Sequence, residues 1–543
     1  MELRGKLVDI VHHKIYPAIV SFDKGVITAI TEFSPEAGTE KELPFILPGF
    51  IDAHVHIESS MLIPSQFARL AVTHGTIATV SDPHEIANVC GMDGVNFMIA
   101  DGKRVPFYFY FGAPSCVPAT IFETAGARLD AKDIALLLEK DEIRYLSEMM
   151  NFPGVIAKDQ EVVAKITVAK KLNKPIDGHA PGLRGEQAKQ YIAAGISTDH
   201  ECFTREEALE KISYGMHIII REGSAAKNFD ALIDLLNDYP EKIMFCSDDK
   251  HPDSLVAGHI NQLCERAVKK KINLYNVLRA ACINPVMHYK LDSGLLRKGD
   301  NADFIVVENL ENFKVLQTYI KGELVADRGK SLIIFSDDNA VGIVNKFSCR
   351  FKKPEDFSED KAISSGNNRF VIEALDGQLI TNKVLVEPGH TGISVQKDIL
   401  KIAVVNRYTE APVAIGYIKN FGLKNGALAS SVAHDSHNIV AVGVSDEDIC
   451  GAVNSIIETK GGISLFSSAN SMILPLPVAG LMSDKDGYMI ARDYAEIDAA
   501  AKALGCTLTS PYMTLSFMAL LVIPHLKISD KGLFDGDSFS ILP

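Results

Sequence analysis

The sequence lacks two features that would place it in other classes of protein. It has no basic excess, because 55 lysines and arginines stand against 69 aspartates and glutamates, for a formal net charge of −14. A chain this acidic lacks the basic footprint expected of a nucleic-acid-binding protein. Its longest apolar run, near residues 517–524, falls short of the roughly 20 residues that a membrane span needs. We therefore expect neither nucleic acid nor membrane as a partner.

Paired cysteines and a leader sequence are lacking as well. The nine cysteines are scattered and include no CxxC pair. An odd number of unpaired cysteines favours free thiols in a reducing compartment over a disulfide framework. The first residues, MELRGKLVDIVHHK, contain no continuous apolar stretch of the kind found in a signal peptide. These features predict a soluble cytoplasmic protein.

The middle of the chain, residues 48–288, alternates short apolar strands with helical segments. Amphipathic stretches at 130–138, 160–172 and 229–236 separate some of the strands. The eight strand candidates end near residues 54–58, 80–84, 111–115, 146–150, 176–182, 197–201, 218–223 and 245–249. Eight such units in this length match a closed parallel barrel, so we predict an α/β fold with a TIM-like (β/α)8 catalytic domain.

Two strand-rich segments flank this region, and a different pattern follows them. Residues 1–47 and 289–335 read as strands joined by turns, and we predict that together they form a small β-sandwich domain. Residues 336–543 mix strand-like and helical runs and are predicted to be a separate C-terminal α+β domain. Near its start, FKKPEDFSEDK is typical of a linker.

The strongest chemical signal is the segment PGFIDAHVHIESS, which contains His54 and His56. In a strand, residues two apart point to the same face, so both imidazoles aim at one point. A lone histidine is more often a core or surface residue. A pair at the end of the first barrel strand is a much more specific indication of a metal site.

Four further candidate ligands follow the ends of other predicted strands, where barrel enzymes place their active sites. They are Glu148, His179, His200 and Asp248, at the ends of the fourth, fifth, sixth and eighth strands. Together with the histidine pair they can hold two divalent ions, with Glu148 as the bridge. Asp248 can both bind an ion and accept a proton from water. Imidazole with carboxylate suits Mn, Fe or Zn.

Other polar residues near the strand ends are weaker candidates with structural alternatives. Asp82 and His84 can contact substrate or a further ion, or simply form a loop that caps a helix. Glu201 can hydrogen-bond a ring nitrogen of the substrate if the strand end bends, or make a structural salt bridge. After the seventh strand, Arg221, Glu222 and Ser224 can shape the substrate pocket or pair with one another.

A histidine pair in the C-terminal region also resembles a metal-binding motif. His434 and His437 stand three residues apart in VAHDSHNIV. Because the barrel already supplies every ligand that two ions need, we predict that this segment is a lid or interface loop.

The motifs resemble those of a known family. PGFIDAHVHIESS, the eight-strand layout and the final aspartate are similar to the amidohydrolase superfamily. SDPHEIANVCG, SEMMNFPGVI, DGHAPGL, REGSAAKN, CSDD, VAHDSHNIVAVG and LPLPVAGLMS resemble, more narrowly, the bacterial adenine deaminases. Many members of the superfamily bridge their metals with a carboxylated lysine on the fourth strand. That strand has no lysine here, and the resemblance implies that Glu148 takes the bridging role.

The resemblance implies hydrolysis of adenine to hypoxanthine and ammonia in purine salvage. For this reaction we predict Asp248 and Glu201 as the catalytic residues. The resemblance also implies a binuclear centre that prefers Mn²⁺ or Fe²⁺, with Zn²⁺ possible, and a homo-oligomer, with a dimer favoured. One alternative is a related hydrolase that acts on a cyclic amide or an N-acetyl sugar. Another is a non-catalytic scaffold protein that retains the fold, although no candidate ligand is missing from the sequence.

Overall fold

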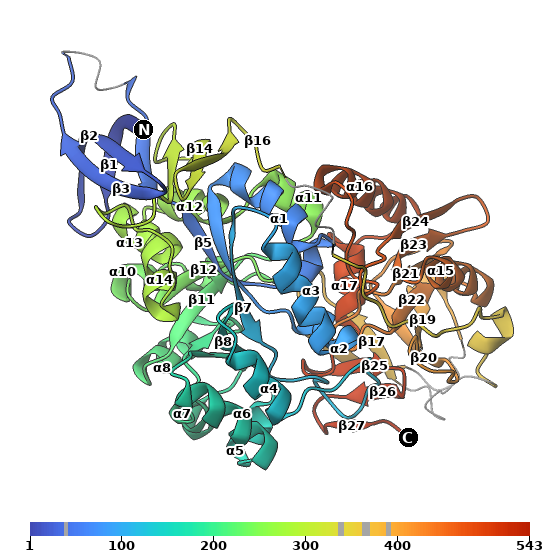
Figure 1. The fold of residues 1–543 in the computed structure, drawn as a ribbon. Coiled ribbons are helices and arrows are strands. Elements are labelled where there is room, and N and C mark those ends of the chain that lie inside the picture. Colours follow the sequence, from blue (N-terminus) through green and yellow to red (C-terminus); the bar gives the residue numbers. More distant parts are fainter. Residues whose placement is uncertain (37–41, 335–340, 361–369, 387–391) are drawn as a thin grey trace.

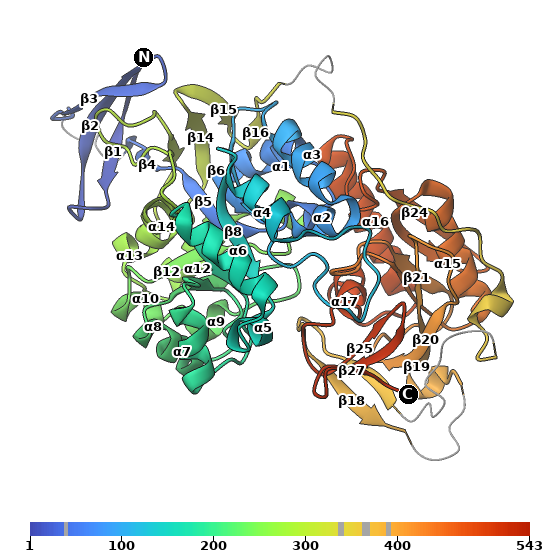
Figure 2. The ribbon, with the colours of Figure 1, turned by 60° about the horizontal axis from the view of Figure 1, so that its bottom comes forward.

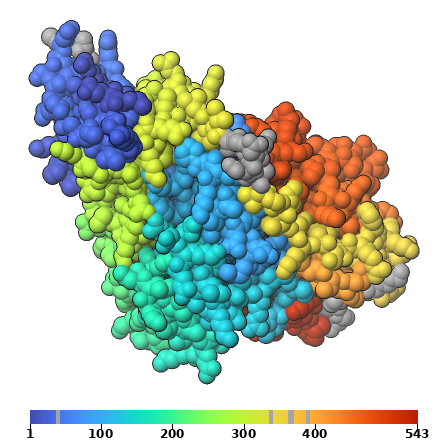
Figure 3. All heavy atoms as spheres, viewed as in Figure 1, coloured from blue at the N-terminus to red at the C-terminus, as the bar shows by residue number. Residues whose placement is uncertain are grey.

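The computed structural model describes residues 1–36, 42–334, 341–360, 370–386 and 392–543. A β-sheet region, a barrel and a C-terminal domain follow one another across the molecule (Figure 1). In the space-filling view the N-terminal strands and the C-terminal domain lie at opposite ends, with the barrel between them (Figure 3). Within the described residues, no helix is both long and apolar enough to cross a membrane.

Eight parallel strands form the barrel, one at each position where the sequence predicted a strand. They are β5 (Phe50–Val55), β6 (Thr76–Ser81), β7 (Tyr108–Ala113), β8 (Ile143–Met149), β9 (Ile176–Gly178), β10 (Thr198–Asp199), β11 (His217–Arg221) and β12 (Ile243–Cys246). Strands β5 to β9 form one parallel sheet in chain order, and β10 to β12 form another.

Backbone hydrogen bonds join the two sheets at both edges. Between β9 and β10, the amide of Ser197 donates to the carbonyl oxygen of Ile176 at 2.9 Å. Between β12 and β5, the amide of Asp248 donates to the carbonyl oxygen of His54, also at 2.9 Å. The barrel is therefore closed, and its closure places Asp248 beside the histidine pair.

Helices cover the outside of the barrel. They are α1 (Pro64–Ala71), α2 (His84–Cys90), α3 (Met92–Gly102), α4 (Ala131–Leu138), α5 (Phe152–Ile156), α6 (Gln160–Lys171), α7 (Gly185–Ala193), α8 (Arg205–Ser213), α9 (Phe229–Leu232), α10 (Leu235–Asp238), α11 (Pro252–Ala257), α12 (Ile260–Lys269), α13 (Leu274–Leu278) and α14 (Asn284–Tyr289). Local sequence explains where some of them begin. The carboxylates of Asp130 and Asp159 accept backbone N–H groups at the starts of α4 and α6, which satisfies donors that a helix leaves unpaired.

The two segments that flank the barrel form one sheet. Its eight strands run in the order β16-β15-β14-β13-β4-β1-β2-β3. Their bounds are β1 (Glu2–Asp9), β2 (Lys14–Asp23), β3 (Val26–Glu32), β4 (Phe45–Pro48), β13 (Phe304–Val307), β14 (Val315–Ile320), β15 (Glu323–Asp327) and β16 (Lys330–Ser331). The sheet folds over a core of its own, in which the rings of Phe22 and Phe304 lie 5.4 Å apart.

The C-terminal domain contains a second eight-stranded sheet, in the order β18-β17-β20-β19-β22-β21-β23-β24, and a three-stranded sheet, β25-β26-β27. The strands are β17 (Phe370–Ala374), β18 (Thr381–Leu385), β19 (Ile399–Val405), β20 (Ala414–Lys419), β21 (Ala427–Ser430), β22 (Ile439–Gly443), β23 (Gly462–Phe466), β24 (Ser471–Pro475), β25 (Leu526–Ser529), β26 (Gly532–Asp535) and β27 (Ser540–Ile541). Its helices are α15 (Asp446–Thr459), α16 (Gly487–Ala503) and α17 (Pro511–Phe517). This mixture of strands and helices is the α+β composition that the sequence predicted.

Two local predictions need correction. The stretch FKKPEDFSEDK is not a free linker over its described part, because Phe357 is fully buried in a core with residues of β19 and α15. Its carbonyl oxygen also accepts a hydrogen bond of 2.8 Å from Lys401. One buried aromatic ring thus anchors a segment that is otherwise charged. The helix predicted over 229–236 is divided into α9 and α10.

The C-terminal domain packs directly on the barrel. Helix α16 contacts α11 and α1, and Arg69 of α1 pairs with Asp486 at 2.8 Å. Turned by 60°, the molecule shows α17 near the barrel's helix α2, with the three-stranded sheet next to α17 (Figure 2). The active-site end of a barrel is its carboxyl edge, and the loops of the C-terminal domain approach the barrel at this edge.

Candidate metal centre

All six predicted metal ligands lie together at the carboxyl ends of the barrel strands. Five of them line one buried cavity. The sixth, His54, lies behind the cavity wall, close to Glu148 and Asp248. None of the six is more than 6% exposed: His54, His56, Glu148, His179, His200 and Asp248. Groups separated by up to 194 residues in the chain therefore meet at one point, as the order of parallel strands requires.

The first group of ligands joins β5 to the end of β12. The Nε2 atoms of His54 and His56 lie 3.2 Å apart. Asp248 Oδ1 lies 3.7 Å from the first of these nitrogens and 3.3 Å from the second. Two nitrogens bound to one ion at 2.0–2.1 Å in a tetrahedral arrangement lie about 3.3 Å apart. The observed separation fits a divalent ion shared by these side chains.

The second group gathers around Glu148 at the end of β8. Its Oε2 atom lies 2.9 Å from His179 Nδ1 and 3.1 Å from His200 Nε2. The other oxygen, Oε1, lies 3.6 Å from His56 Nε2. Oε2 also lies 4.0 Å from His54 Nε2. The Glu148 carboxylate thus lies between the two groups of histidines, in a position that suits a bridging ligand.

Electrostatics keep the two acids ionised. Burial raises the pKa of Glu148, but His179 and His200 outweigh burial and hold it well below its usual range. Burial likewise raises the pKa of Asp248, and Arg221 more than compensates, so that this pKa is also well below its usual range. Carboxylates that remain charged at neutral pH are suited to bind cations.

Arg221 at the end of β11 connects the two predicted catalytic acids. Its Nη1 atom donates to Asp248 Oδ2 at 2.7 Å, and its guanidinium also makes two hydrogen bonds to Glu201. The Oε1 atom of Glu201 lies 3.4 Å from His200 Nε2. The chain bends after β10, so Glu201 faces the cavity. It also makes a salt bridge, which was the alternative role predicted for this residue from the sequence.

Asp82 and His84 lie on the other side of the histidine pair, after β6. His84 lines the cavity, and its Nδ1 atom lies 3.2 Å from Asp82 Oδ2 and 3.5 Å from Glu148 Oε1. The ligand atoms of His56, Asp82, His84 and Glu148 all lie within 4.8 Å of one another. This position allows contact with either an ion or a substrate.

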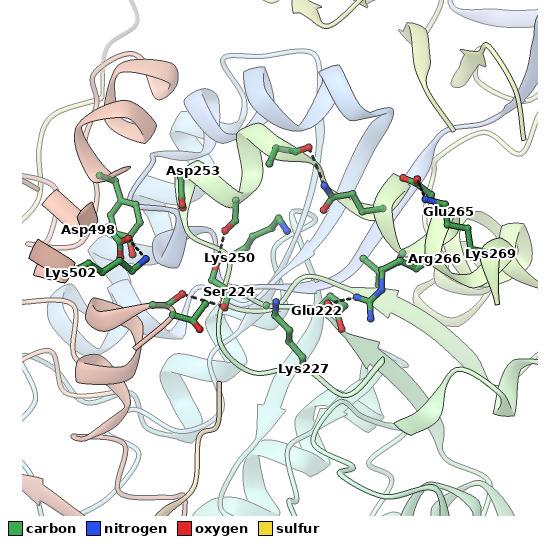
Figure 4. A pocket seen from close by; sticks show the side chains of 18 residues that line it. Glu222, Ser224, Lys227, Lys250, Asp253, Glu265, Arg266, Lys269, Asp498 and Lys502 are labelled. Carbon is green, nitrogen blue, oxygen red and sulfur yellow. Dashed lines mark hydrogen bonds and ion pairs between the residues drawn. The ribbon is translucent and has the colours of Figure 1, made fainter. Parts of the chain in front are cut away.

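Glu222 and Ser224 lie elsewhere. They do not line the cavity of the metal ligands but a second pocket on the outer side of the barrel (Figure 4). Glu222 pairs with Arg266, not with Arg221. Neighbouring residues of a strand face opposite sides, so Glu222 points away from the side that Arg221 faces.

The C-terminal domain forms a roof over the cavity that the sequence did not predict in detail. His434 and His437 both bind the carboxylate of Glu85, the residue after His84. Asp435 and Leu520 also line the cavity from this side. The only sequence signals for this contact were the motif DPHE and the spacing of the two histidines. Neither signal indicates that the histidines meet Glu85.

The roof is tight and charged. Burial lowers the pKa of His434, but the Glu85 carboxylate outweighs burial and raises it to about 9. The cavity below has a volume of about 20 Å³, which is room for about one water molecule. A larger molecule fits only if some of the lining residues move apart.

A buried hydrogen-bond network holds the first and last strands in register behind the ligands. Asp52 accepts hydrogen bonds from the amide and hydroxyl of Ser247, and its Oδ2 atom lies 2.8 Å from His259 Nε2. Asp52 lies two residues before His54 in β5, and Ser247 lies between the end of β12 and Asp248. The network therefore helps to fix the positions of those two ligands.

Comparison with protein families supports the assignment of the barrel. A model of the amidohydrolase family matches residues 45–325. The four imidazoles and two carboxylates at the strand ends have the donor chemistry of a divalent-metal centre. The fold and the site therefore define a hydrolase of the amidohydrolase family with a divalent-metal centre.

Individual relatives match along the whole chain. An "Adenine deaminase" of Sulfurovum sp. (strain NBC37-1) is 55% identical over 100% of this chain and 99% of its own. Those of Salinibacter ruber and Methanosarcina barkeri are 52% and 51% identical, and each comparison covers 99% of this chain and 98% of the relative. A model described as the adenine deaminase C-terminal domain matches residues 378–540. The chain belongs to the adenine deaminase family.

Proposed function

We propose that the protein hydrolyses adenine to hypoxanthine and ammonia. The observation that carries this proposal is that full-length similarity to adenine deaminases coincides with a complete cluster of candidate ligands. The match extends to the C-terminal domain, whose His434 and Asp435 line the cavity. Those residues distinguish this site from a barrel that carries only the metal ligands shared by many hydrolases.

The residues fit a pair of divalent ions. His54, His56 and Asp248 would hold one ion and His179 and His200 the other, with Glu148 between them. Bound divalent ions lower the pKa of water enough for hydroxide to be available at neutral pH. We propose Mn²⁺ or Fe²⁺ as the native ions, with Zn²⁺ as the alternative, since imidazole and carboxylate ligands accept all three.

The acids account for the proton transfers. Water supplies the oxygen that bonds to C6 of adenine and two protons that must be moved. Asp248 accepts one of them and passes it to the departing amino group, which leaves as ammonia. Glu201 carries the other to a ring nitrogen, which must gain a proton when attack at C6 breaks the aromaticity of the ring. Arg221, bound to both acids, holds them at the same edge of the cavity.

Three finer properties belong to the same proposal. The enzyme acts in purine salvage, in the cytoplasm, and as a homo-oligomer, with a dimer favoured. Light scattering on the purified chain would measure its mass in solution. A single species at the 59.2 kDa mass of one chain would contradict the oligomer.

The experiment that tests the activity compares substrates on one preparation. Ammonia release is measured with adenine, and product formation is measured with dihydroorotate, a hydantoin and N-acetylglucosamine 6-phosphate. We expect turnover of adenine alone. Turnover of one of the other compounds without adenine would show a different hydrolase, and no turnover of any by the metal-loaded chain would favour a scaffold protein.

A further inference from the structure

A second pocket lies between the barrel and the C-terminal domain, outside the metal cluster. Its walls come from the loop after β11, from α11 and α12, and from α16 (Figure 4). Its volume is about 500 Å³, within the range of about 300–1,000 Å³ that is usual for small-molecule sites. The pocket therefore has the size of a ligand site, unlike the cavity above the metal ligands.

Most charged side chains around this pocket are paired. Arg266 binds Glu222, Lys269 binds Glu265 and Lys502 binds Asp498. Lys250 and Lys227 are different, because neither ammonium group has an ion pair or a hydrogen bond among the residues that the structure describes. Figure 4 shows both side chains at the pocket without a bonded partner.

The position of Lys250 makes its lack of a partner informative. Only 7% of this residue is exposed, so its charge is largely covered by protein and reaches solvent through the pocket that it lines. A buried charge without a counter-charge is costly and is normally paired or hydrogen-bonded. An anion in the pocket would provide the missing partner, and lysine is a common point-charge partner of phosphate groups.

A third group adds a requirement on the ligand. Asp253 lines the same pocket, and its Oδ1 atom is buried without a hydrogen-bond partner. An acid at this place disfavours a ligand that is anionic throughout, and it requires a hydrogen-bond donor. Leu263 and Tyr494, both buried, supply apolar surface beside it.

We propose that this pocket binds a small phosphate monoester that carries hydroxyl groups. Lys250 and Lys227 bind its phosphate, and Asp253 accepts a hydrogen bond from one of its hydroxyls. The site contacts the loop that carries the proton-transferring acid, because Lys250 follows Asp248 by two residues. The amide of Ser224 also donates to the carbonyl oxygen of Asp249 at 2.8 Å.

Calorimetric titration of the metal-loaded, full-length chain with ribose 5-phosphate and with inorganic phosphate tests the proposal. We expect Lys250→Met and Lys227→Met each to weaken the binding of both probes by about tenfold or more. Asp253→Asn should weaken the binding of ribose 5-phosphate relative to that of inorganic phosphate, because it removes a charged hydrogen-bond acceptor for the hydroxyl and also the repulsion between the acid and phosphate. If Lys250→Met does not fold, the proposal is tested by Lys227→Met, which changes an exposed residue.

Two controls separate this pocket from other sites. Lys269→Met removes a lysine of the same pocket that is already paired with Glu265, and it should bind both probes as the wild type does. His54→Ala disrupts the metal cluster and should also leave phosphate binding intact. Loss of binding in His54→Ala with retention in Lys250→Met would place the anion at the metals and overturn the proposal. Absence of binding to the wild-type chain would overturn it as well.

Discussion

The floor and the roof of the active-site cavity differ in how their residues are placed. The floor consists of strand ends, where His54 and Asp248 meet because β12 closes the barrel against β5. The roof comes from separate segments of the C-terminal domain, among them Leu520 and the loop between β21 and β22. In that loop His434 binds Glu85, 349 residues away in the chain. The barrel geometry fixes the floor, whereas the roof depends on how two domains pack. We therefore expect the floor to determine the chemistry and the roof to determine which substrate is admitted.

The largest effect should come from removing a floor residue. His54→Ala and Asp248→Asn should each lower kcat for adenine by a factor on the order of 10³ or more, because each removes a ligand or the proton acceptor. Ammonia release measures the effect, and circular dichroism checks that the chain is folded. His12→Ala, with its largely exposed ring, is the control. Full activity in either floor variant would remove the proposed site.

The bridge is a more specific test of the floor. Glu148→Gln keeps the size of the side chain but removes the charge that faces both groups of histidines. We expect metal affinity to fall by about 10- to 100-fold, measured by elemental analysis after dialysis. Glu142→Gln changes an acid paired with Lys103 on the outside and should leave the metal content unchanged. Equal metal content in the two variants would mean that Glu148 is not the bridge.

A roof residue should affect substrate use without affecting the metals. His434→Ala should lower kcat/KM for adenine by about tenfold, a loss of roughly 1.4 kcal/mol of transition-state stabilisation, with the metal content unchanged. His525→Ala removes a histidine of the same domain that pairs with Asp537 on the surface and should have no effect. If His434→Ala lost metal in proportion to activity, the floor and the roof would not be separable.

The smallest predicted effect concerns Glu123, a buried residue between β7 and α4 whose neighbouring charges include Asp435 and Asp530 of the C-terminal domain. Burial raises the pKa of Glu123 to about 8, above the value of about 4.3 for an exposed glutamate. Between these values the folded chain retains a proton that the unfolded chain has lost, so this group lowers the free energy of unfolding as the pH rises from about 4 to about 8.

Glu123→Gln should remove this contribution. Melting temperatures at pH 5 and pH 8 should therefore differ less in the variant than in the wild type. The exposed Glu410, which pairs with Arg350, provides the control variant Glu410→Gln. An unchanged difference in Glu123→Gln would show that its carboxyl is ionised in the folded chain.

The same contrast explains which parts of the site the sequence could predict. The period of two residues in a strand brings His54 and His56 together, and the order of parallel strands brings Glu148 to the same edge. Strand alternation also explains why Glu222, which follows Arg221, faces the other way, so that it neither lines the substrate cavity nor pairs with Arg221. These predictions need only local geometry and the closure of the barrel.

The rest requires contacts that no local pattern encodes. The sequence shows His434 and His437 three residues apart, but nothing in it indicates that Glu85 is their partner. Phe357 stands in a charged segment, and only the structure shows that its ring is buried against β19 and α15. Packing between distant segments thus determines the roof and the domain contacts.

One measurement tests the central claim most directly: metal content and ammonia release from adenine, determined on the same preparation as the metal is removed and restored. We predict that the rate of ammonia release rises with metal occupancy and reaches its maximum at about two ions per chain. A metal-free chain that releases ammonia from adenine at the full rate would contradict the account.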